Sequence, residues 1–310
     1  MPKTRVAIGC QGGGSHTAFT AGVLRRLLRE EDVDVRALSG TSGGAICALL
    51  AWYGLVQEDR ELARERLAAF WIDISSRDPW ELLTSRWTLA AYRTVGHFFS
   101  PEVTPYSLPA WGQDRLRAAL AGAVEFDRIA GLVRDGGPRL FVSAVDVLSG
   151  EFRVMRDAEV TVDAILASAA VPTLFRAVEI DGRSYWDGLF SQNPPLRDLA
   201  WERPDEIWII QINKRVRAKV PKSLADIRDR RNELAGNLSL EQELHPIETI
   251  NTLIAQGRLN GSEFKPITVR RIEMQRELDY VSKLDRSPAF IGDMLAYGEE
   301  RADAFLRGRR

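Results

Sequence analysis

Two short segments near the start of the chain constrain the fold most strongly. "VAIGCQGGGSHTAF" begins at Val6 and "LSGTSGGAICALL" begins at Leu38, and each runs from an apolar strand through a glycine cluster into a helix. Strands that alternate with helices predict a parallel sheet covered by helices on both faces. The carboxyl ends of neighbouring parallel strands share one sheet edge, so both glycine turns are expected there. Such turns expose backbone N–H groups that can bind a phosphate, a nucleotide or an oxyanion.

Composition narrows the classes of protein that fit. The net charge is −1 over 310 residues with both signs mixed, so nucleic-acid binding is not indicated. "MPKTR" leads directly into the first strand without a signal peptide, and no run of about eighteen uncharged apolar residues predicts a membrane span. The two cysteines, Cys10 and Cys47, are expected to be reduced and buried in a cytoplasmic protein. Any lipid contact is therefore expected to be peripheral at the membrane.

One basic run, "NKRVRAKVPK" at 213–222, departs from the even charge distribution. We expect a solvated loop after a strand, and the alternative is a patch for a membrane surface. The run is too local to change the overall charge balance.

The remaining sequence extends the alternation into one domain of residues 1–310. We expect a three-layer α/β/α sandwich with a mostly parallel central sheet. A helical cap is expected at about 52–115 and a mainly helical C-terminal extension at about 216–310. The other expected elements are a hairpin of 139–147 with 150–156, a helix at 160–170 before Pro172, a hairpin around 181–182, strands at 206–213 and 267–274, and a helix from Ser287-Pro288.

The expected cap is rich in aromatic residues. Five of the eight tryptophans lie between Trp52 and Trp111, without clean helical spacing. These side chains either pack a helical cap onto the sheet, or form a lid that lines an apolar substrate channel or dips into a lipid interface.

"GTSGG" at 40–44 fits the G-x-S-x-G pattern between a predicted strand and a predicted helix, which is the context that the motif requires. Ser42 is then a candidate nucleophile at a helix N-terminus, and the Gly43 N–H is a candidate oxyanion donor. The alternative is a packing turn whose serine only caps the helix. Gly12, Gly13 and Gly14 leave the neighbouring strand and can supply further oxyanion donors. A nucleotide site fits less well, because the first turn lacks the Lys-Ser/Thr pair of a P-loop.

A nucleophilic serine needs a base, and the histidines fit this role poorly. The order Ser42, Asp187, His245 formally matches a hydrolase triad, but His245 lies in an acidic, surface-like helical stretch. His97 precedes two phenylalanines and is expected to pack, while His16 lies in the first glycine turn as an orienting group. Asp187 ends a predicted strand in "RSYWDGLFSQNPP" and can project from the sheet edge, so a carboxylate is the favoured base.

These residues resemble the patatin-like phospholipases, which use a Ser-Asp dyad. The resemblance covers about residues 5–215 and is carried by four blocks in order: "GCQGGGSHTAF", "GTSGG", "ASAAVPTLF" at 167–175 and "WDG" at 186–188. It implies that Ser42 is the nucleophile and Asp187 its base. It also implies that Gly12 to Gly14 and Gly43 supply the oxyanion hole.

The chain departs from the family pattern in two places. Ser15-His16-Thr17 stands where the family often has Arg-Gly, so we expect His16 to modulate oxyanion stabilisation with pH if its ring reaches the site, or else to pack against the first helix. Leu189 replaces the usual small residue after Asp-Gly and is expected to narrow the pocket.

The sequence therefore predicts a lipid acyl hydrolase that cleaves fatty-acyl esters through an acyl-enzyme. No metal or cofactor is needed, and the expected partner is a lipid or acyl-ester substrate. Two alternatives remain open: an acyltransferase that uses the same acyl-enzyme, and a lipid-binding or scaffold protein without turnover.

Overall fold

The core of the molecule is a twisted sheet. The computed structural model describes residues 3–75, 104–107, 109–172, 174–260, 264–278 and 281–309. Within these residues eight strands form one sheet in the order β5-β6-β3-β2-β1-β7-β8, with β4 paired to β3. The strands are β1 (Thr4–Cys10), β2 (Val33–Gly40), β3 (Arg139–Asp146), β4 (Phe152–Arg156), β5 (Val178–Ile180), β6 (Arg183–Asp187), β7 (Glu206–Gln211) and β8 (Thr268–Glu273).

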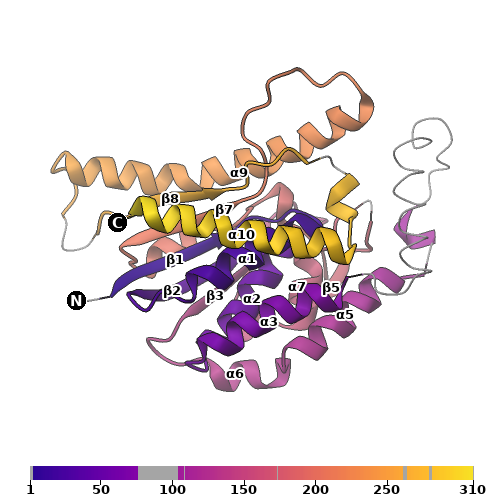
Figure 1. Cartoon of the computed structure of the whole chain (residues 1–310), viewed down its shortest axis with the longest axis horizontal. Helices are drawn as coiled ribbons and strands as arrows, with labels where there is room; N and C mark the ends of the chain where they lie inside the picture. Colours follow the sequence, from indigo (N-terminus) through magenta and orange to yellow (C-terminus); the bar gives the residue numbers. More distant parts are fainter. Residues whose placement is uncertain are drawn as a thin grey trace.

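The central strands are parallel, as the sequence predicts. β3, β2, β1, β7 and β8 run in one direction, whereas β4, β5 and β6 pair antiparallel at one end of the sheet. The predicted hairpins correspond to β3–β4 and β5–β6. Figure 1 shows that the carboxyl ends of the parallel strands point away from the chain termini.

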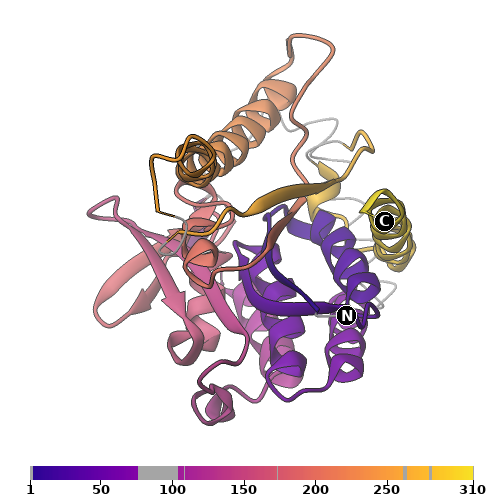
Figure 2. The same ribbon diagram turned by 90° about the vertical axis from the view of Figure 1, so that its left-hand side faces the viewer.

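Helices cover both faces of the sheet, which gives the expected three-layer α/β/α sandwich (Figure 2). One face carries α1 (Ala18–Leu27), α2 (Gly43–Leu55), α3 (Arg60–Asp73), α7 (Val162–Ser168) and α10 (Pro288–Arg309). The other face carries α8 (Arg197–Trp201) and α9 (Leu224–Ala255). The smaller elements are α5 (Trp111–Ala123), α6 (Ile129–Leu132), η1 (Gly14–Thr17), η2 (Pro105–Ser107), η3 (Phe126–Arg128), η4 (Asp157–Glu159), η5 (Gly188–Phe190) and η6 (Val281–Leu284).

Strand β1 shows why its sequence is apolar on both sides. Val6, Ile8 and Cys10 pack into the core under α1 and α2, whereas Ala7 packs into the core under α8 and α9. All four side chains are fully buried. A strand covered on both faces needs no polar alternation, so β1 reads as a continuous apolar run.

The segment proposed as a cap begins inside the core. Trp52, near the end of α2, is fully buried and donates its indole N–H to the Pro138 carbonyl at 2.8 Å. Trp71 of α3 is also buried. Trp111, by contrast, is 76% exposed at the start of α5. Residues 76–103, which include His97, lie outside the described part of the chain, so the cap stays a prediction.

The C-terminal third completes the sandwich. β8 pairs with β7 over its whole length, at the position of the strand predicted at 267–274. α10 packs along α1, where the rings of Phe19 and Tyr297 lie 5.3 Å apart. In the part of the chain that the structure describes, no helix has the length and hydrophobicity that a membrane crossing requires.

Candidate active site

Ser42 sits on a strained turn between β2 and α2. Its backbone angles are φ 57° and ψ −131°, a combination that residues other than glycine rarely adopt. Ser42 is the residue before the first turn of α2 and stays partly exposed, while its neighbours Thr41 and Gly43 are buried. The turn therefore presents one hydroxyl at the carboxyl edge of the sheet, as the G-x-S-x-G pattern predicts.

The glycine two residues after the serine is required by close packing. A Cβ atom on Gly44 would lie 2.2 Å from the Cys10 carbonyl oxygen at the end of β1. The two glycine turns are thus pressed directly against each other, because β1 and β2 are parallel neighbours. The predicted meeting of both turns at one edge is confirmed.

The register of β3 brings Asp187 beside this turn. β4 occupies one edge of β3 from Phe141 to Val145, so β2 and β6 must share the other edge. Gly40, the last residue of β2, pairs with Val142, and Asp187, the last residue of β6, pairs with Ala144. β6 therefore continues the edge where β2 stops, and its terminal carboxylate faces the turn that leaves β2.

Asp187 is buried beside the candidate nucleophile. Its side chain is 1% exposed and accepts a 2.8 Å hydrogen bond from the Leu189 N–H, and the Ser42 hydroxyl lies close enough to lower its pKa. Burial raises the pKa of Asp187 to about 7, and the nearby Ser42 hydroxyl and the hydrogen bond from the Leu189 N–H oppose this rise. A carboxylate with a pKa near neutrality can act as a general base at physiological pH.

The end of α7 and the residues that follow it bind the backbone of both Ser42 and Asp187. The Ser168 Oγ accepts a 3.0 Å hydrogen bond from the Ser42 N–H, and the Ala170 carbonyl accepts one of 3.0 Å from the Asp187 N–H. The "ASAAVPTLF" block thereby links the nucleophile to the base through one short stretch of backbone. In the sequence this block is recognisable through the family resemblance. The small residues before Pro172 also indicate that the block packs closely.

Hydroxyl groups tie the turn after Asp187 to the sheet. The Thr41 Oγ1 and Ser143 Oγ lie 2.7 Å apart, and each donates to the Gln192 carbonyl, at 2.6 Å and 2.7 Å. All three residues are buried. They connect β2, β3 and the chain that follows η5, which limits movement of the Asp187 carboxylate relative to Ser42.

The first glycine turn supplies fewer donors than expected. The Gly12 N–H donates at 2.7 Å to the Asn193 Oδ1, so this group is already engaged. Gly12 instead allows close packing, because a Cβ there would lie 2.8 Å from the Ser42 Cβ. Among the described residues, no hydrogen bond engages the N–H groups of Gly13, Gly14 or Gly43. Gly13 and Gly14 are accessible, and Gly14 has a φ of 58°.

Gln11 braces the same turn from behind. Its Oε1 accepts hydrogen bonds from the Ile212 and Asn213 N–H groups, at 2.9 Å and 2.8 Å, and its Nε2 donates to the Asn237 Oδ1 at 3.2 Å. One fully buried amide therefore joins the ends of β1 and β7 to α9. Sequence reasoning missed this residue, and the only signal is a polar side chain between an apolar strand and a glycine run.

The two histidines in the described part of the chain have other surroundings. The His16 ring is 2% exposed, with Nε2 at 2.7 Å from the Ser282 Oγ of η6 and its centroid 6.0 Å from that of Phe290. This arrangement favours the packing alternative for His16. His245 is exposed on α9. Among the residues that the structure describes, the Asp187 carboxylate is therefore better placed than a histidine to act as the base for Ser42.

The two cysteines are free and buried, as expected. The Cys47 Sγ donates to the Thr17 carbonyl at 3.3 Å, and burial raises the pKa of Cys47 to about 12. Burial also raises the pKa of Cys10. Both groups therefore remain protonated thiols with little nucleophilic character.

Solved structures of two bacterial proteins are similar to this chain. VipD from Legionella pneumophila is similar with 11% identity and a TM-score of 0.47, over 99% of this chain and 67% of VipD. ExoU, in its complex with SpcU from the type III secretion system of Pseudomonas aeruginosa, is similar with 15% identity and a TM-score of 0.39, over 99% of this chain. The chain spans about half of ExoU, 52% of its length.

A search of curated proteins finds no match. The model of the family described as "Patatin-like phospholipase" matches residues 10–200, which include both glycine turns, the segment after α7 and Asp187. This match covers more than half of the 310 residues. The chain belongs to the patatin-like phospholipase family.

Proposed function

We propose that this protein is a serine lipid acyl hydrolase that cleaves fatty-acyl esters of the phospholipid or lysophospholipid type, with Ser42 and Asp187 as its catalytic dyad. The observation that carries the proposal is the placement of a serine hydroxyl on a strained turn beside a buried carboxylate whose pKa is about 7. The family assignment supports a lipid substrate.

In the first half-reaction Asp187 accepts the Ser42 proton while the Ser42 Oγ attacks the ester carbonyl carbon. The carbonyl oxygen becomes an oxyanion, and the N–H groups of Gly13, Gly14 and Gly43 are the candidate donors that stabilise it. The tetrahedral intermediate then collapses. The proton on Asp187 passes to the leaving alcohol, which departs and leaves an acyl ester on Ser42.

In the second half-reaction the unprotonated Asp187 removes a proton from water, which attacks the acyl carbon. The same donors hold the second oxyanion. Collapse expels the Ser42 oxygen, which takes the proton back from Asp187, and the fatty acid is released. The cycle restores both residues without any other group.

The environment of Asp187 explains how a carboxylate can serve as base. An ordinary aspartate has a pKa of about 3.9 and is too weakly basic to remove a serine proton efficiently. Burial of the carboxyl raises its pKa to about 7, which increases its basicity while leaving a substantial ionised fraction at neutral pH. The buried, hydrogen-bonded position therefore supports the role of base.

The test uses purified protein with p-nitrophenyl esters of increasing chain length and with a panel of phospholipids. We expect ester hydrolysis, a loss of at least about a thousandfold in Ser42→Ala, and covalent labelling of Ser42 by a fluorophosphonate. Ser149→Ala, an exposed serine in the β3–β4 turn, is the matched control and should keep both properties. Labelling at another serine, or unchanged hydrolysis in Ser42→Ala, would contradict the proposal.

The acceptor and the cellular location belong to the same proposal. Competition with added alcohols distinguishes hydrolysis from acyl transfer, because an acyltransferase would form new esters in preference to free fatty acid. We propose a cytoplasmic protein that meets its substrate peripherally at a membrane, and the two buried thiols support a reducing compartment.

A further inference from the structure

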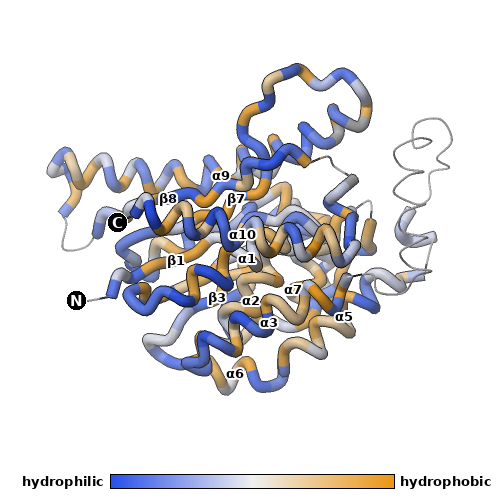
Figure 3. The backbone as a smooth tube through the Cα atoms, in the orientation of Figure 1, coloured by the Kyte–Doolittle hydropathy of each residue, from blue (hydrophilic) through white to orange (hydrophobic). Residues whose placement is uncertain are grey.

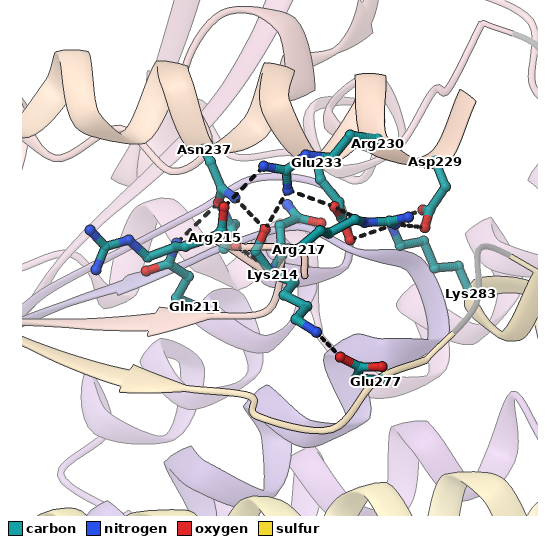
Figure 4. A network of polar contacts seen from close by, with 12 residues as sticks. Gln211, Lys214, Arg215, Arg217, Asp229, Arg230, Glu233, Asn237, Glu277 and Lys283 are labelled. Carbon is teal, nitrogen blue, oxygen red and sulfur yellow. Dashed lines mark hydrogen bonds and ion pairs between the residues drawn. The ribbon is translucent and has the colours of Figure 1, made fainter. Parts of the chain in front are cut away.

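The basic run at 213–222 divides into two parts in the structure. Lys214 and Arg217, which precede the tip of the loop, form ion pairs within the protein (Figure 4), and Arg215 pairs with Glu241 and Glu273. The Arg217 Nε lies 2.9 Å from Glu233, and the same guanidinium also contacts Asp229. Acidic neighbours offset the charge of these three basic groups, so they attract an anion less strongly than lysines without such partners.

The second part of the run has no such partners. Lys219 and Lys222 are exposed, and no ion pair engages them in the part of the chain that the structure describes. Val216 and Val220 alternate with them and are 76% and 80% exposed. Figure 1 shows this loop extending beyond the body of the molecule between β7 and α9. Its far end thus combines free lysines with exposed apolar side chains.

The apolar surface continues along the first half of α9. Leu224, Ile227, Leu234 and Leu238 are 56%, 45%, 40% and 59% exposed. Their spacing of three, seven and four residues places them on one face of the helix. In Figure 3 hydrophobic stretches along this loop and the start of α9 are separated by hydrophilic ones.

In the second half of α9 the same face of the helix is polar. The outward positions after Leu238 are occupied by Gln242, His245 and Thr249, which are exposed and polar. A solvent-facing helix normally carries polar residues at such positions. The exposed apolar face is therefore confined to the half of α9 next to the loop, which marks it as a contact surface.

We infer that a docking surface formed by Val216, Lys219, Val220, Lys222, Leu224 and Ile227, and extended by Leu234 and Leu238, binds an anionic phospholipid bilayer. Exposed valine and leucine side chains enter the boundary between headgroups and acyl chains, and neighbouring lysines contact anionic headgroups. Arg231 is exposed on the same helix face, and Asp226 is the exposed acidic group of the opposite sign nearby.

The charge of the surface argues against a second copy of the chain as its occupant. Two copies that met face to face would bring Lys219, Lys222 and Arg231 of one chain against the same residues of the other. Like charges placed together oppose association. An anionic bilayer complements the same groups.

The surface also lies on the side where the proposed reaction occurs. The loop leaves the carboxyl end of β7, and α9 reaches η5, where a Cβ on Gly236 would lie 3.3 Å from the Leu189 Cδ1. Leu189 follows Asp187 by two residues, and the next residue, Phe190, is 54% exposed. The benefit of this placement for catalysis rests on the proposed function, whereas the binding itself does not.

Binding is tested with vesicles of dialkyl-ether phosphatidylcholine, with and without 30% dialkyl-ether phosphatidylglycerol, because ether lipids contain no ester to cleave. We expect the protein to sediment with the anionic vesicles at least about tenfold more strongly than with the neutral ones. Val216→Ser/Val220→Ser and Lys219→Gln/Lys222→Gln should each weaken this binding roughly tenfold. Trp201→Ser, at a side chain that is 77% exposed on α8, is the matched control and should bind as the wild type does.

Three outcomes would overturn the inference. The wild type could fail to bind anionic vesicles. The two double variants of the loop, here called the tip variants, could bind as tightly as the wild type. The tip variants could also abolish a dimer that the wild type forms without lipid. Hydrolysis of p-nitrophenyl butyrate should be unchanged in the tip variants, which verifies their folding. Vesicle binding without any ester hydrolysis would contradict the proposed function and leave the docking surface standing.

Discussion

Helices α2 and α9 both follow a parallel strand at the carboxyl edge of the sheet, yet they are held in opposite ways. Every residue of α2 from Gly43 to Gly54 is buried, and its side chains pack into one apolar core. The start of α9 is held through Asp229 and Glu233, which pair with Arg217 of the preceding loop. Apolar packing positions the candidate nucleophile, and ion pairs position the exposed surface beside it.

The difference has a consequence for rigidity. Packed apolar side chains resist displacement in every direction. The turn between β2 and α2, here called the elbow, requires such rigid support because Ser42 is held at a strained φ of 57°. Ion pairs fix a loop while leaving its other side open to solvent and to a ligand. We therefore expect mutations near α2 to change catalysis steeply, and mutations around the loop to change stability and binding more than chemistry.

The largest expected effect is on the base. Asp187→Asn should lower kcat/KM by at least about a thousandfold, because an amide cannot accept the Ser42 proton, and Ser42→Ala/Asp187→Asn should be hardly worse than either single variant. The wild-type rate should rise with pH through about 7, where Asp187 loses its proton. Near-normal activity in Asp187→Asn would restore a histidine as base.

The same variant should be more stable than the wild type above neutral pH. The pKa of Asp187 is about 7 when folded and about 3.9 when unfolded, so the folded protein holds an extra proton between these values. Its stability contribution therefore falls as the pH rises from about 4 to about 7. Thermal unfolding at pH 8 should give a higher Tm for Asp187→Asn, and this gain should shrink toward pH 4. A constant difference would show that the carboxyl is not desolvated.

A smaller loss is expected when the elbow loses its support. Ser168→Ala removes the acceptor of the Ser42 N–H and leaves that donor unpaired, which costs about 1–3 kcal/mol. If the unpaired N–H displaces the Ser42 hydroxyl from its reactive position, kcat should fall roughly tenfold to a hundredfold while KM changes little. Steady-state kinetics beside the Ser149→Ala control measure this split. An equal fall in thermal stability with unchanged kcat would make Ser168 purely structural.

The ion pairs of the loop should respond to salt, unlike the core under α2. Arg217→Gln should lower the free energy of unfolding by roughly 2 kcal/mol, because Asp229 and Glu233 lose their shared partner. Leu49→Ala, at a fully buried position of α2, should cost roughly 3 kcal/mol. Urea unfolding is measured at 0.05 M and at 1 M NaCl. The higher salt concentration should reduce the loss of stability in Arg217→Gln and leave the loss in Leu49→Ala unchanged. Equal responses would remove the contrast between the two regions.

Much of the fold was predictable because its signals are local. The apolar runs of β1 and β2, the glycine turns and the hairpins at 146–152 and 181–182 each depend on neighbouring residues. The residues at 216–310 were harder to place. Their helices were predicted as an extension, but α10 packs on α1, which is a contact across more than two hundred residues, and β8 pairs with β7 at a separation of 62 residues.

The candidate site shows the same limit. Ser42 and Asp187 stand out because each occupies a recognisable turn. Ser168 and Gln11 do not, since the hydrogen bond from Ser42 to Ser168 spans 126 residues and that from Ile212 to Gln11 spans 201. The Gly12 N–H was expected to be an oxyanion donor, and only the position of Asn193 after the Asp187 turn reveals another partner.

The smallest expected effect concerns His16 of η1, in the first glycine turn. A charged ring near the oxyanion would add an alkaline limb to the pH dependence of kcat/KM, because imidazolium loses its proton near ~6.5 in water. The ring instead lies with Nε2 at 2.7 Å from the Ser282 Oγ and is 2% exposed. A glutamine amide can keep a hydrogen bond to that hydroxyl. His16→Gln should therefore retain kcat/KM within about twofold, with the single rise assigned to Asp187 still present and no limb removed. A wild-type alkaline limb that disappears in His16→Gln would mean that the ring acts on the oxyanion, and the chemistry at the elbow would then depend on a group outside the buried core.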